Sequence, residues 1–333
     1  MEEMTMDAML AGPQFQDVLD ARARIAGRAV VTPLLNSPFL DELTGGTILL
    51  KAETLQRTGS FKFRGACNRL SMIPEDQRAA GVVACSSGNH AQGVAEAARL
   101  FSMPATIVMP EDAPASKVAR TERSGARVVT YRRGVDDREE IARTIAEETG
   151  AIMVHPFNDP GVIAGQGTAG LELAEQARAM GLEPEAMLTC AGGGGLTAGI
   201  ALALETLVPD CAIHPVEPEG FDDHRRSLIA GEIQANPSES GSVCDALLSR
   251  QPGAIGFEIT RRRARQGLVV SDAEALAAVA FAFRELKLVV EPGGAVTLAA
   301  VLFGKLPVAG RCIALTLSGG NIDPPMLAKA LAE

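Results

Sequence analysis

The sequence predicts an α/β protein made of two open parallel sheets, each covered by helices. Strand and helix signals alternate in the first half of the chain, with strands near 82–85, 105–109, 127–131 and 151–154 and helices near 90–101, 116–124 and 136–149. The alternation resumes after Pro160, with helices near 161–179, 196–207 and 272–286. Three of the polar or glycine-rich segments follow apolar strand signals, which is where α/β folds place their ligands.

Lys62 lies between Phe61 and Phe63, near the start of a predicted helix. Burial lowers the pKa of an ammonium group because the charged form loses its water. A neutral amine is a nucleophile, so a buried lysine can form a Schiff base with a carbonyl cofactor. The alternative for an isolated lysine is a packed stem with its amine in water. Three further motifs favour the first interpretation.

The second motif runs from Cys85 to Gly93, after the apolar strand signal at 82–84. A loop that leads from a strand into a helix offers free backbone N–H groups to an anion. Ser86 and Ser87 add hydroxyl groups, and a carboxylate suits such a site. The alternative is an ordinary serine cap at a helix start.

Four consecutive glycines, Gly192 to Gly195, lie between a predicted strand at 186–191 and a predicted helix. Glycine reaches backbone conformations that are closed to other residues, so successive N–H groups can wrap a phosphate. The run has neither the dinucleotide-binding spacing nor the Walker lysine, which favours a phosphate monoester. The fourth motif begins at Ser318, after the apolar strand at 313–317, and by itself says little.

Together these motifs resemble the tryptophan synthase β-like family of pyridoxal-phosphate enzymes, also called fold type II. The resemblance is closest to its serine/threonine dehydratase and serine racemase branch. It runs from Phe15 to about Pro325 and includes linking segments at 32–34, 155–160 and 163–168.

The resemblance implies a role for each motif. Lys62 would carry pyridoxal phosphate as a Schiff base, and Gly192, Gly193, Gly194 and Gly195 would hold its phosphate. The cofactor ring would contact Phe61, Asn89 and Ser318, with Asn89 at the 3-oxygen and Ser318 at the pyridine nitrogen. A serine at that nitrogen does not force protonation, so the ring is a weaker electron sink that favours β-elimination. The substrate carboxylate would bind to the loop of Ser86, Ser87, Asn89 and His90.

The family arrangement also implies the domain organisation. A small domain, residues 79–156, would be inserted into a large domain of residues 1–78 and 157–333, with the cofactor in the cleft between them. Two segments expected to line that cleft depart from the family pattern. Gly293 stands where relatives usually carry serine, and Ala246 stands where an Asp-Gly pair is usual. The sequence therefore does not predict which residues form the pocket for the substrate side chain.

An acidic turn after the strand signal at 213–216 predicts a cation site. Relatives that bind a divalent cation use a glutamate, a carbonyl and an acid in this spacing, which here are Glu217, the Phe221 carbonyl and Asp223. Such oxygen ligands suit Mg²⁺ or Ca²⁺. The alternative is a solvated acidic turn.

Composition excludes some partners. The formal net charge is −10, which disfavours nucleic acid and anionic membranes. The amino terminus lacks a signal-peptide pattern, and no apolar run reaches membrane-spanning length. The six cysteines include no Cys-x-x-Cys pair, which fits reduced thiols in a cytoplasmic protein. Relatives are commonly dimers or tetramers, so a homo-oligomer is expected.

We therefore expect a pyridoxal-phosphate ammonia-lyase that converts a β-hydroxy amino acid, threonine or serine first, to a 2-keto acid and ammonia. A serine racemase and a 3-hydroxyaspartate dehydratase are alternatives with the same cofactor. A nucleotide-dependent dehydrogenase would share the alternating fold, but this sequence lacks the dinucleotide-binding fingerprint of such enzymes. A non-catalytic amino-acid-binding module would leave Lys62 without a purpose.

Ser87 bears on the choice between elimination and racemisation. Inverting the α-carbon needs an acid or base on the face opposite Lys62. Ser87 occupies the position where racemase-type relatives place that serine, whereas many threonine dehydratases have alanine there. Its alternative role is to bind the carboxylate or cap the helix. Separately, the chain ends 12 residues after Asn321, so the sequence predicts no regulatory domain and no inhibition by isoleucine.

Overall fold

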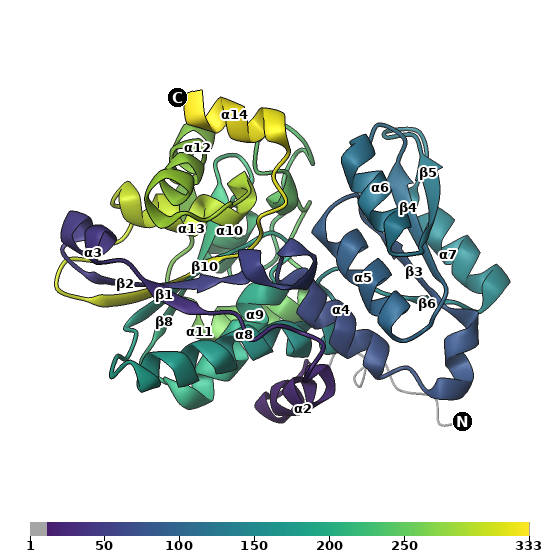
Figure 1. Ribbon diagram of the computed structural model, residues 1–333, viewed down its shortest axis with the longest axis horizontal. Coiled ribbons are helices and arrows are strands. Elements are labelled where there is room, and N and C mark those ends of the chain that lie inside the picture. Colours follow the sequence, from purple (N-terminus) through teal and green to yellow (C-terminus); the bar gives the residue numbers. More distant parts are fainter. Residues whose placement is uncertain (1–11, 333) are drawn as a thin grey trace.

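The computed structural model describes residues 12–332 (Figure 1). Residues 1–11, on which the expectation about a signal peptide depends, lie outside the described residues, as does Glu333. Two sheets form the framework, and the expected α/β class with two such sheets is confirmed.

The larger sheet has six strands in the order β1-β2-β10-β7-β8-β9. They are β1 (Leu34–Asn36), β2 (Thr47–Ala52), β7 (Ala186–Cys190), β8 (Ala212–Pro218), β9 (Leu268–Val270) and β10 (Cys312–Leu317). All neighbours are parallel except β1, which runs antiparallel to β2. A parallel crossover needs a dozen or more residues, whereas only the short helix α3 (Pro38–Thr44) joins these two strands. This sheet is therefore parallel except at its edge.

The smaller sheet is parallel throughout, in the order β5-β4-β3-β6. Its strands are β3 (Val82–Cys85), β4 (Ala105–Pro110), β5 (Arg127–Tyr131) and β6 (Ile152–Met153). Three of them match the expected strands closely, and the last is shorter than expected. All four lie inside the segment 79–156 that the family resemblance assigns to a small domain.

Helices cover both sheets (Figure 1). Around the smaller sheet are α5 (Asn89–Leu100), α6 (Ala115–Arg123) and α7 (Arg138–Thr149). The others are α2 (Phe15–Ile25), α4 (Lys62–Ser71), α8 (Pro160–Ala179), α9 (Gly195–Leu207), α10 (Asp223–Ala230), α11 (Ala254–Arg263), α12 (Asp272–Phe281), α13 (Pro292–Leu302) and α14 (Pro324–Ala332). The helix expected over 272–286 is α-helical only to Phe281 and continues as a π-helical turn over Ala282–Leu286.

The two faces of the larger sheet bury separate cores. Leu50 points to the side of α12 and α13, and its neighbour Leu49 points to the side of α8 and α9. Successive side chains of a strand alternate between faces, so one strand supplies both cores. Figure 1 shows the sheet between these two helical layers.

Helix α4 connects the two parts of the molecule. Phe63 and Ala66 belong to the core of the smaller sheet, while α4 also packs against α8 of the larger one. The α4–α8 contact is close, because a Cβ on Gly165 would lie 2.6 Å from the Cα of Gly65. The first residue of this connecting helix is Lys62.

Candidate active site

Lys62 is partly buried where the two sheets meet. Its Nζ lies 2.9 Å from the carbonyl oxygen of Pro156, to which it donates, and 5.2 Å from the centre of the Phe61 ring. Burial lowers the pKa of the Lys62 ammonium to about 8. A sizeable fraction of neutral amine is therefore present near neutral pH, as a nucleophile or general base requires.

Backbone pairing holds the loop before α4 against the end of β10. Ser60 forms a bridge with Gly319, and the Phe61 N–H donates to the Ser318 carbonyl at 3.1 Å. The Gly320 N–H donates to the Gly59 carbonyl at 2.8 Å. Ser318 is almost fully buried beside the Cys190 thiol. The structure thus brings Ser318 and the Phe61–Lys62 segment together, although they are distant in sequence.

Asn89, the first residue of α5, is part of a polar chain. Its Nδ2 donates to Glu291 at 2.5 Å, and its Oδ1 accepts from Asn321 Nδ2 at 2.7 Å. Asn321 also donates to the Thr58 carbonyl at 2.8 Å. Asn89 therefore lies next to the Ser318 loop, as a residue that contacts the same ligand should.

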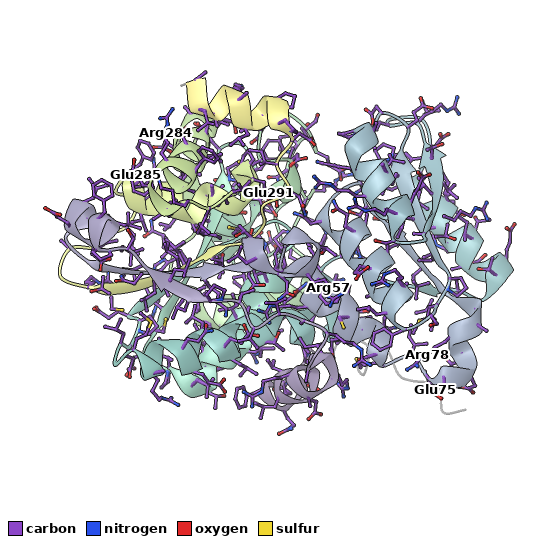
Figure 2. The ribbon with its side chains drawn as sticks, in the orientation of Figure 1. Arg57, Glu75, Arg78, Arg284, Glu285 and Glu291 are labelled. Carbon is purple, nitrogen blue, oxygen red and sulfur yellow. The ribbon has the colours of Figure 1, made fainter. Side chains whose placement is uncertain are left out.

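Glu291 is a candidate site residue in a segment that the sequence reasoning placed at the cofactor cleft without giving this carboxyl a role. It is buried at the start of α13, and Figure 2 labels it. Burial, together with the charge of Asp245, raises the pKa of this carboxyl to about 7. A carboxyl that titrates near neutral pH beside Asn89 can change the charge and hydrogen bonding of the site. The sequence signal that could have indicated a role for Glu291 is a carboxylate directly before Pro-Gly-Gly at a helix start.

The serine loop presents unused donors. The backbone N–H groups of Ser87, Asn89, His90 and Ala91 donate to no other group of the described chain. They lie at the N-terminus of α5, where the helix dipole also favours an anion. This arrangement fits the expected carboxylate site and indicates that its contacts come largely from the backbone.

The imidazole of His90 lies outside that site. It is buried, and its Nε2 lies 3.0 Å from the carbonyl oxygen of Val154. Burial and the nearby Lys62 charge lower the pKa of His90 to about 3, so the ring is neutral. The part of His90 that remains for a carboxylate is its N–H, because the helix turns its side chain toward the smaller sheet.

The glycine loop joins β7 to α9 and leaves no room for side chains. Gly194 has φ +87°, in the left-handed region that favours glycine. A Cβ on Gly193 would lie 2.1 Å from the Phe157 ring, and one on Gly194 would lie 2.5 Å from His224. No hydrogen bond within the described chain uses the N–H groups of these glycines, so they are free to bind an anion.

The acidic turn folds into a buried pair. Glu217 caps α10, because its two oxygens accept from the N–H groups of His224 at 2.7 Å and Arg225 at 2.9 Å. Asp223 accepts from Asn236 at 2.7 Å through Oδ1, whereas its buried Oδ2 has no hydrogen-bond partner among residues 12–332. Burial and the neighbouring Asp223 charge raise the pKa of Glu217, and burial raises that of Asp223 to about 7.

Glu217, Phe221 and Asp223 are therefore buried, whereas Glu219 and Gly220 of the same turn are exposed. No group of three His, Cys, Asp or Glu side chains within residues 12–332 has metal-binding geometry. The expected third ligand is the backbone carbonyl of Phe221, which is also buried. An unpaired buried oxygen beside a second carboxylate is what an absent cation, or a proton, would satisfy.

A cavity of about 890 Å³ opens beside the site. His155, Phe157 and Asn158 form one wall, adjacent to the Pro156 carbonyl that accepts from Lys62. Its polar lining includes the following four residues from different parts of the chain: Tyr131, Arg138, Glu239 and Arg250. Arg138 lies 3.7 Å from Glu239, while no ion pair or hydrogen bond among the described residues involves the Arg250 guanidinium.

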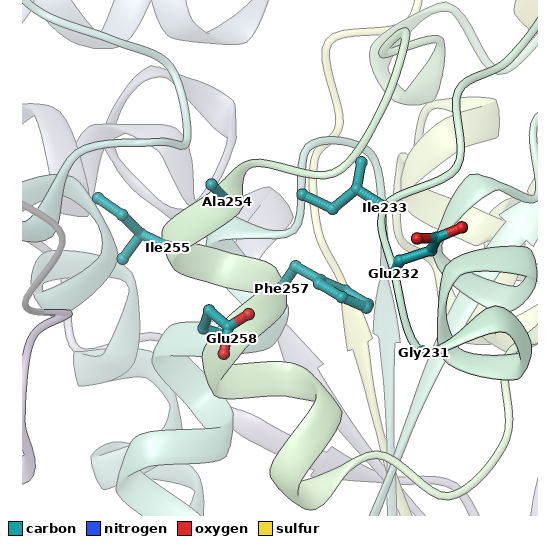
Figure 3. A pocket seen from close by; sticks show the side chains of 7 residues that line it. All are labelled: Gly231, Glu232, Ile233, Ala254, Ile255, Phe257 and Glu258. Carbon is teal, nitrogen blue, oxygen red and sulfur yellow. The ribbon is translucent and has the colours of Figure 1, made fainter.

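A second hollow of about 480 Å³ lies between α11 and residues 231–233 (Figure 3). Phe257 points from α11 toward Glu232 in this view. None of the expected site residues lines this hollow.

Known proteins that are similar in sequence and in fold identify the family of this chain. The sequence matches the family described as "Pyridoxal-phosphate dependent enzyme" over residues 25–319. An L-threo-3-hydroxyaspartate ammonia-lyase of Pseudomonas sp is 46% identical and the match covers 93% of this chain and 95% of that protein. A serine racemase of Schizosaccharomyces pombe is 38% identical, with 98% and 100% covered. The solved structure of maize serine racemase is 36% identical, with a TM-score of 0.90 and 96% and 97% covered.

The fold and the site define an α/β enzyme with a half-buried lysine whose amine donates to the Pro156 carbonyl. The chain belongs to the family of pyridoxal-phosphate dependent enzymes. This confirms the resemblance, the cofactor and the enzyme class, and the expected ammonia-lyase reaction agrees with the relatives. No helix among residues 12–332 is both long and apolar enough to cross a membrane.

The residues present fit pyridoxal phosphate. A Cβ at Gly193 or Gly194 would clash with Phe157 or His224, and the N–H groups of the loop suit a phosphate. Lys62 supplies an amine of lowered pKa for a Schiff base. Phe61 and Ser318 are joined by a backbone hydrogen bond, and Asn89 accepts a hydrogen bond from Asn321 of the same loop as Ser318.

Proposed function

We propose that this chain is a β-hydroxy amino-acid ammonia-lyase, with threonine and serine as first substrates. The observation that carries the proposal is the Lys62 amine, which has a lowered pKa and lies near two strand-to-helix loops with free N–H groups. One loop would hold the cofactor phosphate and the other the substrate carboxylate.

The chain's own residues then have defined tasks. Bound pyridoxal phosphate supplies an electron sink for the substrate α-carbon. The Lys62 amine removes the α-proton, and the N–H groups of Ser87, Asn89 and His90 fix the carboxylate so that this proton faces Lys62. The β-hydroxyl would take up a proton and leave as water, which balances the α-proton held by Lys62, and the released enamine would hydrolyse to a 2-keto acid and ammonia. Ser318 would face the pyridine nitrogen without imposing a charge on it.

The test is a Lys62→Ala variant with Lys329→Ala, on the exposed face of α14, as the control. Lys62→Ala should lose the borohydride-reducible visible absorbance and about 10³-fold or more of turnover. The control should keep both. Peptide mapping that found the pyridoxyl group on another lysine would contradict the site assignment.

A second candidate substrate is 3-hydroxyaspartate, which the name of the Pseudomonas relative also suggests. The specific observation is the cavity beside Pro156, which contains Arg138 and the Arg250 guanidinium without an ion-pair partner among the described residues. Guanidinium groups bind a second carboxylate through paired hydrogen bonds. Neither threonine nor serine carries such a group.

A substrate panel decides between these candidates. If the acidic substrate is used, Arg250→Ala should lower its kcat/KM about 10- to 100-fold and leave that of threonine nearly unchanged. Arg261→Ala, on the exposed side of α11, is the matched control. A wild-type enzyme that turns over threonine but not threo-3-hydroxyaspartate would eliminate the second candidate.

We also propose that Ser87 allows weak racemisation of serine beside elimination. Its backbone N–H is free, and its hydroxyl is on the loop that would hold the substrate. Ser87→Ala should abolish interconversion of serine enantiomers and spare most elimination of the L-isomer, as chiral chromatography would show. Interconversion at the parent rate in the variant would exclude this role.

The remaining assignments are proposals of assembly and location. Exposed Phe39, Leu43 and Phe283 lie on α3 and the π-helical turn, and the Phe39 ring stacks on Phe281 with centres 6.1 Å apart. This apolar surface supports a homo-oligomer, which sedimentation would detect.

The six free cysteines support a cytoplasmic location. The small domain of residues 79–156 would be tested by limited proteolysis at its ends.

A further inference from the structure

Four buried charges lie under the first turn of α4. We call Lys51, Glu53, Arg64 and Glu172 the Arg64 cluster. Arg64 is fully buried and donates to both oxygens of Glu53 at 2.8 and 2.9 Å. It also donates to both oxygens of Glu172, each at 2.7 Å. One guanidinium thus holds a carboxylate from the segment after β2 and another from α8.

The remaining polar groups complete the cluster. Lys51 Nζ donates to Glu172 at 2.7 Å, to the Thr32 carbonyl at 2.7 Å and to Gln176 at 3.0 Å. The Thr32 hydroxyl donates to Glu53 at 2.6 Å, and Thr168 accepts from Arg64 at 3.1 Å. Two cations therefore face two anions with every charged side chain hydrogen-bonded.

Stability alone does not account for this arrangement. A buried ion-pair network is often no more stabilising than well-packed apolar side chains of the same volume. What paired guanidinium bonds add is direction, because the planar fork fits a carboxylate in one orientation only. The cluster therefore fixes an orientation of α4.

That orientation determines where Lys62 points. Residues of an α-helix are about 100° apart, so Arg64 lies about 200° around the axis from Lys62. Arg64 faces the larger sheet, and Lys62 faces Pro156 on the opposite side. Farther along the helix, α4 meets α8 at the close Gly65–Gly165 contact. Asn68 of α4 also donates to the Gly161 carbonyl of α8 at 2.7 Å.

We propose that Arg64 is a positioning residue that sets the rotation of α4 and so aims the Lys62 amine into the cofactor site. The inference rests on the proposed role of Lys62. The bonds to Glu53 and Glu172 anchor the N-terminal end of α4, and their loss would let that end rotate while the Asn68 bond holds the rest of the helix. A turn of α4 moves the Lys62 amine away from the Pro156 carbonyl and from the space beside the glycine loop.

The test compares Arg64→Lys with Lys51→Met in the holoenzyme. Arg64→Lys keeps the charge but loses the fork, whereas Lys51→Met removes a charge from the same cluster without touching α4. Arg64→Lys should lower kcat about 10- to 100-fold with little change in KM, since small misplacements of a catalytic group cost this much. It should also change the visible circular dichroism of the lysine-bound cofactor and the midpoint of its absorbance titration.

Lys51→Met is expected to retain the wild-type circular dichroism and titration midpoint, even where it unfolds at a lower temperature. If Arg64→Lys does not fold, Thr168→Val serves instead, because it removes one acceptor of Arg64 and leaves all ion pairs. That variant should produce a smaller change of the same kind. Wild-type kcat and dichroism in the folded Arg64 variant would overturn the proposal, as would equal changes in Lys51→Met.

Mapping the reduced pyridoxyl group in the wild type keeps this result separate from the proposed function. A pyridoxyl group on another lysine refutes the role of Lys62 itself. A pyridoxyl group on Lys62 with an unaffected Arg64→Lys variant refutes only the positioning role.

Discussion

The Arg64 cluster and the Glu217–Asp223 pair are both buried carboxylate sites in the larger part of the molecule, but only the first contains its own cations. Glu53 accepts from Arg64, and the pKa of Glu53 is lowered, with the nearby Arg64 charge opposing the effect of burial. Glu217 and Asp223 are held by neutral donors, and their pKa values are raised. The first site is therefore complete, and the second requires a cation or protons from outside.

The largest effect is expected from removing a carboxylate from the complete site. Glu53→Ala removes a buried ion pair and leaves the Nε of Arg64 without an acceptor among the described residues, which should lower the free energy of unfolding by about 3–5 kcal/mol. Urea denaturation measures this. The exposed Glu75→Ala, which loses only an ion pair with Arg78 on the surface, should change it by less than about 1 kcal/mol (Figure 2). Equal losses in both variants would contradict the comparison.

The next effect comes from filling the incomplete site. Mg²⁺ or Ca²⁺ at about 100 times its dissociation constant should raise the free energy of unfolding by about 2.7 kcal/mol if it binds only the folded chain. Chelation should reverse the gain, and Asp223→Asn should abolish it. Identical melting curves with cation and with chelator would show that Glu217, the Phe221 carbonyl and Asp223 do not bind a metal.

The smallest effect is a difference in pH dependence, measured with chelator present. An acid whose pKa is raised by folding binds more protons in the folded state than in the unfolded state. The free energy of unfolding therefore falls as pH rises from the unfolded-state pKa, near 4, through the folded-state pKa. For Asp223 that window extends to about pH 7. Relative to the wild type, the free energy of unfolding of Asp223→Asn should therefore increase by about 2 kcal/mol between pH 5 and pH 7.

The pKa of Glu53 is shifted in the opposite direction, so its effect on stability depends on pH with the opposite sign. Its lowered pKa contributes stability above the unfolded value, near 4.5, and that stability is lost as pH falls through the folded value. Comparing wild type with each single variant cancels the shifts of Glu291 and the buried histidines. A wild type and an Asp223→Asn variant with parallel profiles between pH 5 and pH 7 would show that Asp223 is ionised throughout.

Much of the site was predictable because its parts are local in sequence. Lys62 is bracketed by phenylalanines, and Gly192 to Gly195 sit between a strand and a helix. These patterns describe a loop and its two flanking elements, which a short window contains. The smaller sheet was predictable for the same reason, since each of its strands alternates with a helix.

The rest depends on contacts between distant residues. Arg64 and Glu172 are 108 positions apart, and no short pattern pairs them. The side chain of His90 is turned from the loop toward Val154 by the helical phase of α5, which residue type does not reveal. The direction of β1 likewise follows from the short connection through α3.

Tyr131 gives the molecule a built-in optical probe. It is the only tyrosine, the chain has no tryptophan, and its phenol lines the cavity whose other wall includes Arg250 and Gly253. Excitation at wavelengths that phenylalanine does not absorb therefore gives ultraviolet emission from one side chain at the end of β5. Any motion of the smaller sheet toward residues 250–253 would change the surroundings of that phenol, so such a motion could be followed without attaching a dye.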